Sequence, residues 1–111
     1  MSCKKKVYAE IARERPHKCT GCGKRKHLSH SHLVPVSKRK DLECEKENIT
    51  YHCLSVGTVG CHDKWGSCEY RQMRELNDFY SNMEKVKKLD RQRYIFLVNR
   101  FRLQGFNDEK L

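Results

Sequence analysis

The sequence lacks any long hydrophobic run. Met1 leads directly into a polar and basic segment, so we expect no secretory signal peptide. No stretch approaches the roughly 18 apolar residues that cross a bilayer, and we therefore expect no membrane partner. Internal repeats and low-complexity tracts are missing as well. These absences favour a cytoplasmic protein, and a chain of 111 residues is the usual length of a single domain.

Acidic side chains are scarce beside basic ones, with 14 Asp and Glu against 24 Lys and Arg. The net charge of +10 predicts a polyanionic partner. Nucleic acid is the main candidate, because phosphate contacts supply affinity that does not depend on sequence. A generic basic surface is the alternative. Hydrophobic residues make up 37% of the chain, which gives a thin core of the kind that a structural metal commonly stabilises.

Cysteine, in contrast, is abundant. Cys19 and Cys22 are separated by two residues, and Cys53 and Cys61 form a second pair further along the chain. Four soft thiolates in two clusters are what a closed tetrahedral zinc site needs. We therefore predict a structural Zn²⁺, with reduced core cysteines as the alternative. The three remaining cysteines are expected to be free thiols: Cys3, Cys44 and Cys68.

Hydrophobic patterning predicts an α+β fold. The expected elements are a helix over 4–15, strands over 28–36 and 48–54, a turn over 56–60, the first turn of a helix over 61–65, and helices through the last 45 residues. Asp90 is the expected N-cap of the last helix and Gly105 its stop. Two apolar stripes are expected in the core: Met73, Leu76, Tyr80, Met83 and Val86, then Tyr94, Leu97, Val98 and Phe101.

Three histidines are placed to form a second site. On a strand, His30 and His32 point to one face and Ser31 to the other. His62 directly follows the last predicted zinc ligand, so the shared zinc would bring it towards the hairpin. Imidazoles beside such a zinc suggest a hydrolytic centre, where a divalent ion polarises a phosphate oxygen and a neutral histidine takes a proton from water. The other histidines are expected to be structural or close to phosphate: His17, His27 and His52.

The order of these motifs resembles the His-Asn-His (HNH) endonuclease family. The resemblance covers residues 19–65 and includes the first cysteine pair, the segment 28–35 ending His-Leu-Val-Pro, an asparagine five residues before Cys53, and Cys61 followed by His62. That family has a ββα-metal fold, often with a four-cysteine zinc. The resemblance implies one zinc-stapled ββα-metal domain over 1–111, with an N-terminal basic helix over 1–18 and a C-terminal helical arm over 66–111. The arms look similar to those of small phage or prophage HNH proteins, which act in a bacterial host cell.

By this resemblance, His32 is the general base, and Asn48 holds it in place through side-chain amide bonds to backbone across the loop between the strands. His62 matches a ligand of the catalytic ion, which would be Mg²⁺, Mn²⁺ or another divalent ion. Ser31 stands where the family has Asp or His, and this is the main departure. His30 is the candidate for the missing ligand.

A second departure is Trp65, at a position where the family often has Lys. Basic side chains near the motif are candidate nucleic-acid contacts: Lys24, Arg25, Lys26, Lys38, Arg39, Lys40 and Lys64. The predicted function is metal-dependent hydrolysis of DNA phosphodiester bonds. Two alternatives stay open. One is a zinc-stabilised nucleic-acid-binding module without chemistry, and the other is a protein whose C-terminal helices form a homodimer or join a phage-encoded complex.

Overall fold

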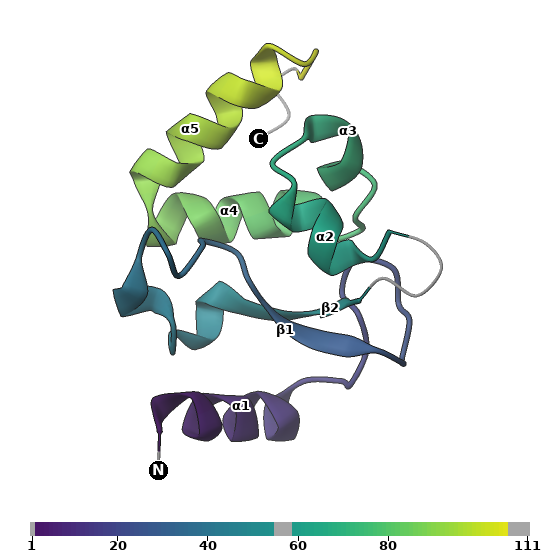
Figure 1. Ribbon diagram of the computed structural model, residues 1–111, viewed down its shortest axis with the longest axis vertical. Coiled ribbons are helices and arrows are strands. Elements are labelled where there is room, and N and C mark those ends of the chain that lie inside the picture. The colour runs from purple at the N-terminus through teal and green to yellow at the C-terminus, as the bar shows by residue number, and fades with distance from the viewer. Residues whose placement is uncertain (1, 55–58, 107–111) are drawn as a thin grey trace.

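The computed structural model describes residues 2–54 and 59–106. Two strands followed by a short helix lie at its centre, with helices on both sides (Figure 1). The elements are α1 (Cys3–Glu14), β1 (Leu28–His32), the 3₁₀ turns η1 (Lys40–Leu42) and η2 (Lys46–Asn48), β2 (Ile49–Cys53), α2 (Cys61–Gly66), α3 (Tyr70–Met73), α4 (Phe79–Leu89) and α5 (Arg91–Arg102). The predicted α+β class is confirmed.

The sheet is an antiparallel pair in which Leu28 faces Cys53 and His32 faces Ile49. β1 ends at residue 32, earlier than predicted. The strand does not continue because the side chain of Asn48 takes the place of a neighbouring strand. It forms hydrogen bonds with both the N–H and the carbonyl of Val34. The loop between the strands therefore begins directly after His32.

Each face of the sheet carries its own apolar core. Figure 1 shows α1 on one side of the sheet and α2 and α4 on the other, with α5 beyond α4. The smaller core joins α1 to the sheet through Val7, Ile11, Ile49 and Tyr51. The larger core joins the loop after β1 to the helices that follow the sheet. All five residues of β2 are thus buried, while β1 is half-buried except at Ser31.

The C-terminal arm departs from the continuous stripe that the sequence predicts. Residues 74–78 separate α3 from α4, and the N–H of Asn77 donates to the carbonyl of Gly21 at 2.9 Å. This break shifts the helical phase, so Phe79 is in the core while Tyr80 is 47% exposed. The core assignment of Tyr80 was wrong. The N-cap assignment of Asp90 is confirmed, since its carboxylate accepts from the N–H of Arg93 at 3.0 Å.

The chain carries a disulfide between Cys3 and Cys44, which joins the first residue of α1 to the loop between η1 and η2. The prediction of free thiols was wrong for these two residues, because a separation of 41 residues gives no spacing signal. It is confirmed for Cys68. Most of the turn predicted over 56–60 lies outside the described residues. None of the helices described is both long enough and apolar enough to span a membrane.

Candidate metal centre and histidine site

The four predicted zinc ligands meet at one point. The sulfur atoms of Cys19, Cys22, Cys53 and Cys61 all lie within 4.8 Å of one another. They come from the loop after α1, the end of β2 and the first residue of α2. Three of these side chains are buried and Cys22 is exposed. The cluster could hold a metal ion such as zinc, and an ion there would join three segments that are distant in sequence.

Neighbouring thiols change one another's pKa within the cluster. Burial raises the pKa of Cys61 far above its ordinary value, and the hydrogen bond and charge of Cys19 raise it further. Burial would also raise the pKa of Cys53, but hydrogen bonds, led by the one from the Cys61 N–H at 3.4 Å, lower it overall. Four adjacent thiolates repel one another, and a bound dication removes that penalty. The donor set therefore fits Zn²⁺.

Two glycines allow close approach around the cluster, Gly21 to a sulfur atom and Gly60 to the backbone after β2. A Cβ on Gly21 would lie 2.9 Å from the Cys61 sulfur, and one on Gly60 would lie 2.5 Å from the Cys53 carbonyl oxygen. The N–H of Gly21 donates to the Cys19 sulfur at 3.3 Å. Backbone donors thus face the sulfur atoms, as the glycine-containing turns of the sequence predict.

His62 lies in the first turn of α2 and faces Ser29 of β1. The hydroxyl of Ser29 donates to the carbonyl of His52 at 2.8 Å, so it accepts from the Nδ1–H of His62 at 2.9 Å. This arrangement leaves the lone pair of the neutral ring on Nε2. Metal-binding histidines are commonly oriented by such a partner on the second nitrogen. The sequence did not identify Ser29, although it shares a strand face with Ser31.

His32 is the last residue of β1 and its ring is oriented by the loop that follows. Its Nε2 lies 2.9 Å from the carbonyl oxygen of Glu43. A carbonyl can only accept, so Nε2 carries the proton and Nδ1 keeps the lone pair. The side chain is half-buried, so the ring is neither sealed in the core nor free in solvent. This is the tautomer and setting that a general base needs.

Asn48 holds the loop closed. Its side chain is fully buried, and its amide oxygen accepts from the Val34 N–H at 2.7 Å. Its amide nitrogen donates to the carbonyls of Val34 and Leu42 at 3.1 and 3.2 Å. These bonds cross the loop between the strands, as expected. Because Leu42 precedes Glu43, Asn48 also fixes the carbonyl that orients His32.

The structure brings neither His30 nor His32 to His62, because His62 contacts Ser29 and alternation along β1 places both of the other histidines on the opposite face of the sheet. His30 stacks on Tyr8 of α1, with ring centroids 3.7 Å apart, on the face opposite Ser29 and His62. The expectation that His30 supplies the missing ligand is therefore corrected, because alternate strand residues point to opposite faces. Burial, followed by the charges of His32 and His17, lowers the pKa of His30. Among the residues described, the group suited to a metal is the set of four cysteines.

Ser31 and Trp65, the two positions at which the sequence departs from the motif, are both buried. Ser31, at the site of the usual acidic ligand, is only 2% exposed. The indole N–H of Trp65 donates to the carbonyl of Leu33 at 3.0 Å, so this side chain is a buried support for the loop after β1. Neither residue offers a charged group.

A buried hydrogen bond between a histidine and an aspartate lies beside the cluster and was not predicted. Asp78, just before α4, accepts from His52 at 3.0 Å and from the Thr20 hydroxyl at 2.5 Å. Burial would raise the pKa of Asp78, but these hydrogen bonds outweigh it and hold the pKa below its ordinary value. The contact ties the C-terminal arm to the first cysteine pair. No local sequence signal identifies it, because Asp78 lies far from the motif.

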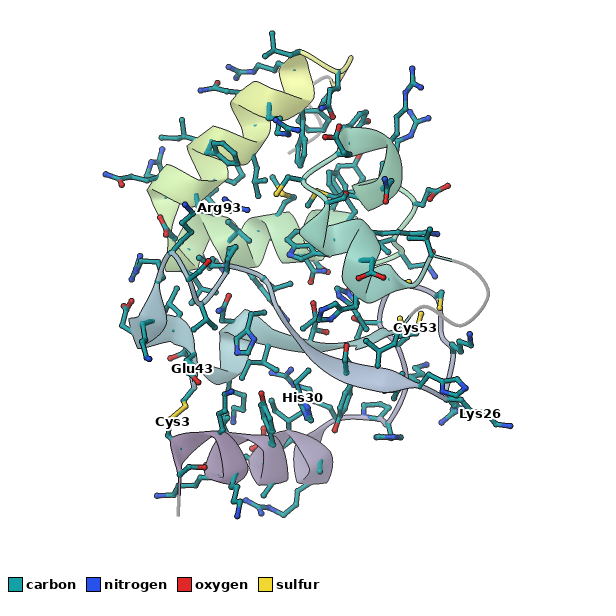
Figure 2. The ribbon with its side chains drawn as sticks, viewed as in Figure 1. Cys3, Lys26, His30, Glu43, Cys53 and Arg93 are labelled. Carbon is teal, nitrogen blue, oxygen red and sulfur yellow. A yellow bond between two sulfur atoms is a disulfide. The ribbon has the colours of Figure 1, made fainter. Side chains whose placement is uncertain are left out.

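The predicted nucleic-acid contacts divide into two groups. Arg39 pairs with Asp41 at 2.7 Å and with Asp90 at 3.3 Å, and Lys64 pairs with Glu75 at 3.3 Å. The others form no ion pair within the described part of the chain: Lys24, Arg25, Lys26, Lys38 and Lys40. The segment 24–26, between the first cysteine pair and β1, therefore presents three unmatched positive charges, and Lys26 projects from the end of the sheet in Figure 2.

Comparisons with protein-family models, with curated proteins and with solved structures find no match to this chain.

Proposed function

We propose that this protein is a zinc-stabilised, metal-dependent endonuclease of the HNH type that hydrolyses DNA phosphodiester bonds. The observation that carries the proposal is the pair of contacts that fixes His32. Asn48 closes the loop, and the Glu43 carbonyl accepts a hydrogen bond from the Nε2–H of His32, which leaves Nδ1 as a base. A histidine that only packed in the core would not need this support.

The two histidines have separate roles. His32 accepts a proton from water at Nδ1 while the water oxygen forms a bond to phosphorus and the bond to the leaving oxygen breaks. His62, oriented by Ser29, offers Nε2 to a divalent ion such as Mg²⁺ or Mn²⁺. When bound, that ion polarises a phosphate oxygen and stabilises the charge on the leaving oxygen. The zinc has four protein ligands, so its role is to hold the fold.

The substrate reaches both histidines at the outer edge of β1. His32 and His62 lie on opposite faces of the sheet, which has two strands in the described part of the chain. No strand among the described residues pairs with that edge of β1, and a DNA backbone lying along it would meet side chains from both faces. The unmatched charges of residues 24–26 directly precede β1, and Lys26 projects from the end of the sheet, where it can meet a phosphate of the same DNA.

A second candidate is a nucleic-acid-binding module without catalysis. The observation that favours it is Ser31, which replaces a charged ligand and is buried. This candidate keeps the zinc and the basic edge but binds no second ion. It predicts DNA binding that weakens with salt and no cleavage with any divalent ion.

The decisive experiment compares the parent protein with His32→Gln in a supercoiled-plasmid assay with Mg²⁺ or Mn²⁺. Glutamine keeps an N–H donor for the Glu43 carbonyl but cannot accept the proton from water. We expect the parent to nick the plasmid and the variant to lose activity by about 100-fold or more.

The matched control is His17→Ala, which removes an exposed imidazole outside the proposed site. It should nick at the parental rate. Zinc content and melting temperature should be the same in all three proteins. Equal cleavage by His32→Gln and the parent would contradict the assignment of the base, and a parent without cleavage would favour the binding module.

A further inference from the structure

We propose that α1 is a thiol-sensitive clamp, closed by the Cys3–Cys44 disulfide, which positions the His32 ring through Glu43. The helix lies outside the motif shared with the HNH family, and the inference concerns how this chain in particular holds its base. The inference depends on the proposed endonuclease function only in the test that measures DNA cleavage.

Consecutive contacts link the two ends of the clamp. Cys3 is bonded to Cys44, and the neighbouring Lys4 pairs with the side chain of Glu43 at 3.3 Å. The backbone carbonyl of the same Glu43 accepts from His32 at 2.9 Å. Figure 2 shows the disulfide at the start of α1, with Glu43 directly above it. The bond that fixes the start of α1 is therefore one residue away from the carbonyl that orients His32.

The remainder of α1 is held by contacts that do not involve sulfur. Tyr8 stacks on His30, and Ile11 is fully buried against the sheet. At the other end, the guanidinium of Arg15 donates to the backbone carbonyls of Ile49 and Lys46. Opening the disulfide therefore removes the covalent restraint between the first residue of α1 and Cys44, beside Glu43, while the helix stays docked.

The chemistry of opening is a two-electron reduction by a dithiol. The dithiol transfers two electrons and two protons, each cysteine sulfur becomes a thiol, and the reductant leaves as its cyclic disulfide. In a reducing cytoplasm such a bond is usually transient and serves as a sensor. The four clustered cysteines respond differently, because they contain no disulfide to reduce.

The first test observes His32 directly. Nitrogen-15 spectra of the histidine rings in the zinc-loaded protein report which ring nitrogen carries the proton. With the disulfide closed, we expect His32 to be a single tautomer protonated at Nε2. After treatment with dithiothreitol, with zinc content unchanged, we expect a mixture of tautomers. The double variant Cys3→Ser/Cys44→Ser should show the mixture without reductant.

The second test measures cleavage of supercoiled plasmid by the same samples. We expect the reduced protein and the double serine variant to cut about tenfold more slowly than the closed form, because small misplacements of a catalytic group are costly. Cys68→Ser, which removes the free thiol, is the matched control. It should cut at the parental rate and remain sensitive to reductant.

The outcomes distinguish a failure of the clamp proposal from a failure of the proposed endonuclease function. An unchanged His32 tautomer after reduction would overturn the proposal, whatever the cleavage rate. Faster cleavage after reduction would also overturn it, since α1 would then be a cover over the site. If neither form cuts DNA, the ring spectra still decide whether the clamp exists.

Discussion

At the scale of single residues, hydrogen-bonding capacity decides which side chains have a structural role. Asn48 is fully buried and satisfies three backbone groups at once. An aspartate could not donate to two carbonyls, and an aliphatic residue would leave all three groups unpaired. This role follows from the motif, and the sequence predicted it correctly.

Replacing Asn48 with Ala should lower the free energy of unfolding by about 3 kcal/mol, since each lost hydrogen bond contributes about 1 kcal/mol. Chemical denaturation of the zinc-loaded protein measures the change. Asn77→Ala is the control, because that side chain is exposed, and it should alter stability by less than about 0.5 kcal/mol. A similar loss of unfolding free energy in both variants would mean that the side-chain hydrogen bonds of Asn48 contribute little to stability.

The sequence did not show which side chains each histidine would contact. Strand alternation correctly places His30 and His32 on one face. It does not say from which side α2 approaches, and α2 brings His62 to the face of Ser29. Which side chain contacts each face of β1 depends on packing between elements that are distant in sequence, and no local sequence pattern predicts such packing.

At the scale of secondary-structure elements, close approach around the cysteine cluster determines how α2 and the first cysteine pair pack. Gly21 lies against the Cys61 sulfur and against Leu76 of the C-terminal arm. Element types were predictable because apolar periodicity and capping residues are local signals. The C-terminal end of β1 and the break between α3 and α4 were not predictable, because they depend on Asn48 and on Gly21.

Gly21→Ala should weaken zinc binding by about tenfold or more, because its Cβ would lie 2.9 Å from the Cys61 sulfur and 3.0 Å from Leu76. Competition with a chromophoric chelator measures the affinity. Gly66→Ala, in α2, is the matched control because a Cβ there meets no atom within 4 Å. It should bind zinc normally and raise stability by about 0.5 to 1 kcal/mol. Equal zinc affinity in both variants would contradict the packing argument.

At the scale of the whole molecule, charge is distributed unevenly. The net charge of +10 was evident from composition, but the ion pairs that neutralise Arg39 and Lys64 were not. The charges that stay unmatched beside β1 belong to residues 24–26, and they are the ones expected to contact phosphate.

Replacing Lys24, Arg25 and Lys26 together with Ala should weaken DNA binding and reduce the slope of log affinity against log salt by about 2 to 3, since each lost phosphate contact contributes about 0.9. Fluorescence anisotropy with a duplex measures the slope. The control removes the same charge from α4 through Lys85, Lys87 and Lys88, and it should leave the slope within about 1 of the parental value. Equal changes in both triple variants would point to non-specific attraction by the overall charge.

The measurement that tests the account most directly is the zinc content of the purified protein together with the dependence of its folding on that zinc. We expect one zinc ion per chain in native mass spectra, and loss of helical circular dichroism when a strong chelator removes it, because ligands from three segments meet only at the ion. Cys53→Ser should bind zinc much more weakly, while Cys68→Ser should match the parent. A zinc-free protein with the same helical signal and melting temperature as the parent would contradict the account.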